Sequence, residues 1–187
     1  MSADTLARRL GTTTHLSPLL MKARRLGLGA PGNLERLAIQ RGCSYYDGAG
    51  DATCGLAGYS AAAVTDPGVT VFSNEALAVA LLSVTLPYSQ HRLRLGAAMT
   101  GAAGNSPALV ARLAIQERCG AVLRHIALCG RKVEPANPFW AELLTLLPES
   151  AMPAPDVLPH ITRLVAMTGI TRRGRETVMQ WIRPAAA

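Results

Sequence analysis

The segment RLAIQRGC, Arg36 to Cys43, returns 76 residues later as RLAIQERC, Arg112 to Cys119. Three other landmarks recur in the same order around it: RLG at 25–27 and 94–96, GAPGN at 29–33 against GAAGN at 101–105, and CG at 54–55 and 129–130. The offsets between the copies are 69, 72 and 75 residues, and small insertions and deletions in loops would produce such differences. Matches in the same order at a similar offset predict two diverged copies of one structural unit.

Each copy has the pattern of a helical hairpin. Apolar residues at i, i+3 and i+4 of the repeated segment indicate a helix with one buried face; they are Leu34, Leu37 and Ala38 in the first copy and Val110, Leu113 and Ala114 in the second. Glycines before it predict the end of an earlier helix, and Asn33 and Asn105 are expected to cap the start of the repeated one. In the second copy Ser106 and Pro107 strengthen that start.

The copies differ after their shared cysteine. CGAVLRHIALCG predicts a third helix in the second copy, whereas the Gly- and Asp-rich CSYYDGAGDATCG predicts a loop in the first. Further helices are expected from Asn137 onward in NPFWAELLTLLPES, then at 158–168 and about 175–182. The Ala- and Leu-rich, aromatic-poor composition also favours helices.

These patterns together predict an all-α fold of roughly six to eight short helices. We expect one helical domain over residues 1–187, built from two diverged helical-hairpin repeats and a C-terminal helical extension. The repeats cover about 5–55 and 76–130, the linker between them 56–73, and the extension 131–187.

The formal net charge of +7 comes almost entirely from arginine, since Lys22 and Lys132 are the two lysines among 19 basic residues. Arginine forks suit carboxylate and phosphate groups, so the charge favours an acidic protein or a nucleic acid as partner. The alternative is a coding bias toward Ala, Gly and Arg. The chain shows no secretory signal, and its longest apolar run, Ala76 to Leu86, is too short to span a membrane. We therefore expect a cytoplasmic protein without membrane association.

Four cysteines occupy matched positions, Cys43 with Cys119 and Cys54 with Cys129. A pseudo-two-fold packing of the copies would bring four thiols together, which is enough for zinc or an iron–sulfur cluster. The spacings between them lack tight chelating loops, however, and free cysteine is among the most buried residue types. Packing in the core is the favoured role, with a metal site or a redox pair as alternatives, and no cofactor is expected.

The segment from Leu164 to Pro184 has the outline of a helix-turn-helix, with Gly169 at the turn. In such a unit Arg172, Arg173 and Arg175 would contact bases and phosphates. Nucleic-acid binding by these arginines is accordingly an alternative function.

No Walker loop, dinucleotide-binding glycine fingerprint, nucleophile elbow or HExxH helix occurs in the sequence. The sequence thus names no catalytic residue and favours a non-enzymatic protein, without deciding the question. Paired helical repeats leave a broad face for a partner, so the favoured function is an interaction or adaptor protein that binds a peptide or an acidic protein surface. The candidate contacts are four arginines that the alignment places at matched positions of the two copies, Arg24, Arg25, Arg92 and Arg94. The sequence does not define an oligomeric state.

Overall fold

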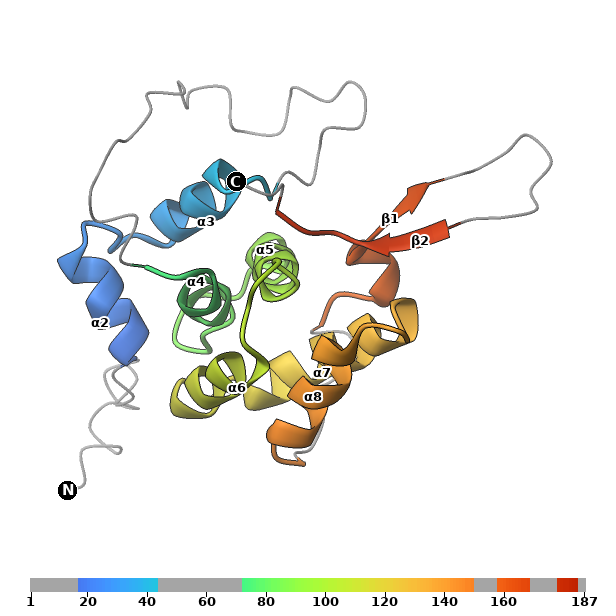
Figure 1. Ribbon diagram of the computed structural model, residues 1–187. Helices are drawn as coiled ribbons and strands as arrows, with labels where there is room; N and C mark the ends of the chain where they lie inside the picture. The colour runs from blue at the N-terminus through green and yellow to red at the C-terminus, as the bar shows by residue number, and fades with distance from the viewer. Residues whose placement is uncertain (1–16, 44–71, 150–157, 169–177, 185–187) are drawn as a thin grey trace.

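The computed structural model describes residues 17–43, 72–149, 158–168 and 178–184 (Figure 1). Within these ranges the chain forms seven α-helices, one short 3-10 helix and one two-stranded antiparallel sheet. The α-helices are α2 (Pro18–Arg25), α3 (Pro31–Gln40), α4 (Asn74–Leu81), α5 (Gln90–Thr100), α6 (Pro107–Gln116), α7 (Gly120–Val133) and α8 (Pro138–Leu146). The expected all-α class with several short helices is confirmed.

The α4–α5 pair lies at the centre of the fold, between the other helices (Figure 1). Residues 76–81 of α4 come from the longest apolar run of the sequence, and all of them are buried. α5 packs closely against α4 at Gly96, where a Cβ atom would lie 2.7 Å from Cδ2 of Leu82. A larger side chain at this position would therefore push the two helices apart. Despite its apolar centre, the described part of the chain has no helix that is long and apolar enough to cross a membrane.

Two groups of helices cover this pair, α2 with α3 on one side and α6 to α8 on the other (Figure 1). The apolar stripes predicted for α3 and α6 do face the core. Five of their six residues are buried and Leu113 is partly buried; the five are Leu34, Leu37, Ala38, Val110 and Ala114. The predicted third helix of the second copy is also present, as α7.

α3 and α6 cover aligned segments of the repeated text, PGNLERLAIQ and PALVARLAIQ, and they end in the same way. Cys43 and Cys119 each donate the backbone N–H to an alanine carbonyl five residues back, at 3.1 and 3.0 Å. The residue before each cysteine has a positive φ, 89° at Gly42 and 58° at Arg118. This is the Schellman helix ending, and it turns both cysteines into the core. The duplication of the whole unit remains a prediction from the sequence.

Most helix starts in the described ranges have a serine cap, and α8 has an asparagine cap, with Oδ1 of Asn137 accepting the N–H of Phe139 at 3.1 Å. Four serine hydroxyls accept the N–H of the residue three positions ahead, as an N-cap does; they are Ser17, Ser73, Ser89 and Ser106. The capping role expected of Asn33 and Asn105 is therefore wrong. Each donates its side-chain N–H to the carbonyl six residues earlier, Gly27 at 3.2 Å and Met99 at 2.8 Å. Asparagine carries both donor and acceptor atoms, and here its donor groups satisfy the end of the preceding helix.

The C-terminal region contains a β-hairpin, so the helices expected at 158–168 and 175–182 are wrong. A 3-10 helix, η2 (Ile161–Arg163), leads into β1 (Val165–Thr168), which pairs antiparallel with β2 (Val178–Trp181). Val165 lies opposite Trp181 in this register. Apolar runs of only four residues fit either a helical or a strand period, and β-branched and aromatic residues at these positions favour the strand.

Candidate functional site

The surface charge of the described ranges is strongly cationic. The exposed carboxylates there are Glu142 and Glu149. Nine basic residues are exposed in the same ranges: Lys22, Arg24, Arg25, Arg36, Arg112, Arg118, Arg131, Lys132 and Arg163. The exposed charges of the described ranges therefore attract an acidic molecule more strongly than they repel it.

Four of these cations lie on α2 and α3, which we call the basic hairpin. Lys22, Arg24 and Arg25 occupy the last turn of α2, where the negative end of the helix dipole favours positive charge. Arg36 is exposed on α3. The acidic residue of the hairpin, Glu35, is half-buried. Burial lowers the pKa of the Arg92 guanidinium, and the nearby charge of Glu35 raises that pKa by a smaller amount. The outer surface of the basic hairpin thus carries cations without an exposed carboxylate among its described residues.

Arg92 and Arg94 do not belong to this surface. Arg92 is 4% exposed, and its Nε donates to the carbonyl of Leu81 at the end of α4, at 3.0 Å. Arg94 is half-buried and donates from Nε to the carbonyl of Arg163 at 3.2 Å. The expectation that these two residues match Arg24 and Arg25 is therefore wrong.

The mismatch has a structural cause. The RLG match sets the end of α2 against the middle of α5, because Leu26 follows α2 whereas Leu95 is inside α5. The serine caps of α2 and α5, Ser17 and Ser89, give an offset of 72 residues instead of 69. At the corrected offset, Arg25 corresponds to Ala97.

A buried carboxylate fixes the start of the basic hairpin. Oε1 of Glu117, at the C-cap of α6, accepts the backbone N–H of Leu19 in the first turn of α2, at 2.8 Å. Its Oε2 is buried and has no hydrogen-bond partner among the described residues. Arg41 is the aligned residue after α3, and it donates to Asn74 at the start of α4, at 2.7 Å. In both copies, the residue that ends the repeated helix thus holds the beginning of another helix.

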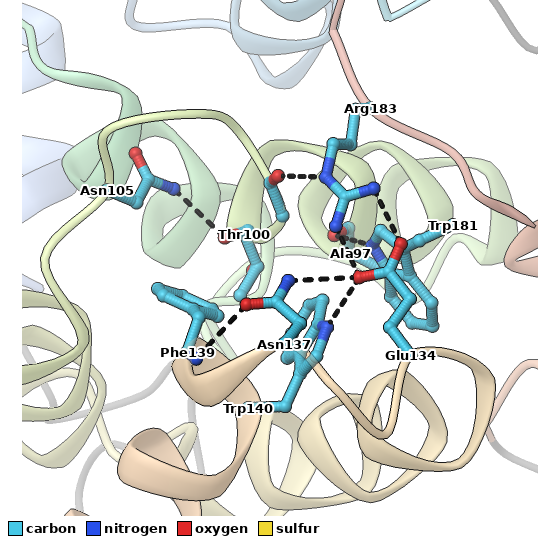
Figure 2. Close-up of polar contacts among 10 residues, drawn as sticks. Ala97, Thr100, Asn105, Glu134, Asn137, Phe139, Trp140, Trp181 and Arg183 are labelled. Carbon is cyan, nitrogen blue, oxygen red and sulfur yellow. Dashed lines mark hydrogen bonds and ion pairs between the residues drawn. The ribbon is translucent and has the colours of Figure 1, made fainter.

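A polar network joins the C-terminal strand to α5, α7 and α8 (Figure 2). We call its five residues, Glu134, Asn137, Trp140, Trp181 and Arg183, the Glu134 cluster. Arg183 donates to both carboxylate oxygens of Glu134, with Nη1 to Oε1 at 2.6 Å. Oε2 also accepts from Trp140 Nε1 and Asn137 Nδ2, each at 3.0 Å.

This network determines the protonation state of Glu134. Burial raises the pKa of the carboxyl, but hydrogen bonds from Arg183, Trp140 and Asn137 and the charge of Arg183 outweigh it and hold the pKa at about 2. Glu134 is therefore ionised at neutral pH. With every donor directed at it from the protein itself, this carboxylate is a structural anchor, not a group left for a substrate.

The two tryptophans of the cluster fit against glycines. Their rings pack edge to face with centroids 4.9 Å apart, and Trp181 Nε1 donates to the carbonyl of Ala97 at 3.2 Å. A Cβ at Gly101 would lie 2.6 Å from Trp181 Cδ1, and a Cβ at Gly130 would collide with the Trp140 ring. The glycines thus create the space in which the C-terminal strand packs against α5 and α7.

The cysteines do not gather around one point. Cys119 and Cys129 lie ten positions apart along α7, which separates them by about 15 Å at 1.5 Å per residue. The thiol of Cys43 contacts the Met99 sulfur at 3.2 Å in the core. Burial raises the pKa of Cys43 and of Cys119 to about 12. Among the residues that the structure describes, no three His, Cys, Asp or Glu side chains form a metal-binding group, and Cys54 lies outside them.

The arginines of the supposed helix-turn-helix, Arg172, Arg173 and Arg175, also lie outside the described residues. The segments on either side of them are β1 and β2, not helices. The helix-turn-helix interpretation is therefore wrong, while nucleic-acid binding by these arginines stays a prediction.

Sequence reasoning missed the Glu134 cluster and the buried Glu117. A weak signal for the cluster is that both tryptophans of the chain follow or precede a charged residue by a few positions, Glu134 before Trp140 and Arg183 after Trp181. Nothing in the local pattern shows that these two segments meet.

Comparisons with known proteins give no relative for this chain. No family model, no curated protein and no solved structure matches it.

Proposed function

We propose that the protein is a cytoplasmic, non-enzymatic interaction protein whose basic hairpin binds an acidic segment of another protein. The observation that carries this proposal is the charge distribution, with nine exposed cations against two exposed carboxylates in the described ranges. The basic hairpin holds four of the nine.

Arg24 and Arg25 are the principal contacts in this proposal. Both are exposed, adjacent in sequence and placed in the last turn of α2. A guanidinium offers a planar fork of donors that matches a carboxylate, so two neighbouring arginines suit a segment with several glutamates or aspartates. The N-terminal turn of α2 is held by Ser17 and Glu117, so the helix presents these arginines from a fixed base.

A nucleic acid is the second candidate partner, because exposed arginines also suit phosphates. Arg172, Arg173 and Arg175 add three cations to the chain between β1 and β2. The acidic protein segment is preferred because the basic hairpin concentrates its charge on two short helices.

The test is the affinity for a fluorescent peptide that alternates glutamate with leucine, measured by anisotropy at low and at physiological ionic strength. The variant Arg24→Gln with Arg25→Gln removes two exposed charge contacts of about 0.5–1 kcal/mol each, so its affinity is expected to fall about fivefold to thirtyfold. The matched control replaces Arg112 and Arg118, which are equally exposed but belong to the α6 segment, by glutamine.

The proposal requires the control to retain affinity within about twofold of the wild type. Equal losses in both variants would mean that the peptide responds to total charge and not to the basic hairpin. A single-stranded or duplex oligonucleotide that binds more tightly than the peptide, with affinity falling steeply as salt rises, would replace the acidic segment by a nucleic acid.

A further inference from the structure

A pocket of ≈ 350 Å³ lies between the second half of α7 and the segment that leads into η2. This volume is at the lower end of the range of roughly 300–1,000 Å³ that is typical of small-molecule sites. Leu128 of α7 and Leu158 and Ile161 of the facing segment supply apolar surface. The pocket is separate from the basic hairpin, to which none of its lining residues belongs.

The polar groups of the pocket are hydrogen-bond donors. Nε2 of His125 lies 3.2 Å from the carbonyl oxygen of Pro159, and since a carbonyl only accepts, this nitrogen carries a hydrogen. Nδ1 of His160 accepts the backbone N–H of Thr162 at 3.4 Å and lies 3.0 Å from the Thr162 hydroxyl. The tautomer that fits this backbone contact carries its hydrogen on Nε2. The side chain of His160 is exposed and lines the pocket, so this Nε2–H is available to a ligand.

Lys132 supplies a full positive charge. Its side chain is exposed in the last turn of α7 and lines the pocket. The described residues offer its ammonium neither a hydrogen bond nor an ion pair. No aspartate or glutamate is found among the described lining residues. The described lining residues therefore combine an apolar wall with cationic and neutral donors and include no opposing carboxylate.

Cys129 does not convert this pocket into a nucleophilic site. Its sulfur lies 3.7 Å from Nε2 of His125, but that nitrogen already donates its hydrogen to the Pro159 carbonyl and cannot take a proton from the thiol. Burial raises the pKa of Cys129, and the nearby Lys132 lowers it by a smaller amount. The thiol is thus a neutral part of the wall, which indicates binding and not covalent chemistry.

We propose that this pocket binds a small organic monocarboxylate, with the carboxylate at Lys132 and His160 and the hydrocarbon body against Leu128, Leu158 and Ile161. A phosphate fits less well, because it brings more negative charge than a carboxylate to a pocket whose described lining has one ammonium and no arginine fork. This proposal is independent of peptide binding at the basic hairpin.

The experiment titrates the full-length protein with hexanoate and follows leucine methyl signals by NMR. Hexanol tests binding to the apolar wall without a charge, and acetate tests binding to the charged groups without a hydrocarbon chain. Inorganic phosphate tests whether another anion binds in place of the carboxylate. We expect saturable hexanoate binding that shifts the methyl signals of Leu128 and Leu158 and is tighter than that of the other three. Replacement of Lys132 by glutamine should weaken hexanoate about tenfold, the effect of one charge-assisted hydrogen bond, and leave hexanol unchanged.

The matched control is Arg131→Gln, which removes an exposed cation from the same turn of α7 but outside the pocket. Its affinity for hexanoate should equal that of the wild type. Three results would overturn the proposal: no saturable hexanoate binding, tighter binding of phosphate than of hexanoate, or equal losses in the Lys132 and Arg131 variants.

Discussion

The replacement Glu134→Gln removes the charge at the centre of the Glu134 cluster while nearly preserving its shape. The carboxyl has a pKa of about 2 in the fold against an ordinary value of 4.5. At about 1.36 kcal/mol per pKa unit, this difference makes the ionised form worth about 3 kcal/mol of folding free energy at neutral pH. The side chain of Glu134 is only 17% exposed, so solvent screening takes little from this figure. We therefore expect the variant to lose about 3 kcal/mol of stability at about pH 7.

The loss should depend on pH in a defined direction. A lowered pKa means that the unfolded chain binds a proton before the folded one does, so the stabilisation is complete above 4.5 and disappears as the pH falls through about 2. By about pH 3, roughly 2 of the 3 kcal/mol should be gone from the wild type. The difference in the free energy of unfolding between the wild type and Glu134→Gln should decrease by the same amount.

Urea unfolding followed by tryptophan fluorescence measures this directly, because Trp140 and Trp181 are the two tryptophans of the chain and both belong to the Glu134 cluster. The control variant is Glu142→Gln, at an exposed glutamate of α8, and it should stay within about 0.5 kcal/mol of the wild type. A difference in the free energy of unfolding between the wild type and Glu134→Gln that stays constant from about pH 7 to about pH 3 would refute the reasoning.

Three further substitutions test the local structure by urea unfolding at neutral pH. Arg118→Gly should stabilise the protein by about 0.5–1 kcal/mol, because a non-glycine residue at a φ of 58° is strained, and an unchanged or lower stability would contradict the Schellman ending assigned there. Gly130→Ala should cost about 3 kcal/mol or more, because its Cβ collides with the Trp140 ring, and a cost below about 1 kcal/mol would contradict that packing. Glu117→Ala should lower the free energy of unfolding by about 2 kcal/mol, because it leaves the buried N–H of Leu19 without an acceptor. Glu117→Gln should lower it by less than about 1 kcal/mol, because the amide oxygen still accepts that N–H. Equal losses in the two variants would contradict this role of Glu117.

The parts of the fold that follow from sequence are those set by local pattern. The stripe of Leu34, Leu37 and Ala38 is buried as predicted, and its counterpart in α6 is buried except for the partly buried Leu113, because helical periodicity places those residues on one face. Ser106 and Pro107 begin α6 as expected, since a side-chain acceptor followed by a fixed φ suits a helix start.

The parts that do not follow depend on which segments meet in space. The pairing of Glu134 with Arg183 joins residues 49 positions apart, and nothing near either residue indicates the other. The final strand is held by long-range contacts of the same kind, because Trp181 of β2 donates to the Ala97 carbonyl and packs against the Trp140 ring. A short run such as VMQW has no period of its own that would select a strand.

The candidate site illustrates the same limit. The RLG match aligns Arg25 with Arg94, yet Arg25 is exposed at the end of α2 and Arg94 is half-buried inside α5. The drift in alignment offset across a loop is enough to assign an arginine to the wrong turn. Exposure, which separates the proposed contact residues from the buried structural ones, requires the tertiary structure.

The most direct test of the proposed function is an amide chemical-shift map of the protein during titration with the glutamate–leucine peptide. The account requires the largest shifts to fall on the basic hairpin, around Arg24, Arg25 and Arg36, with little change in α7 and α8. Shifts that are spread evenly over the exposed arginines, or that concentrate on α6 to α8, would contradict it.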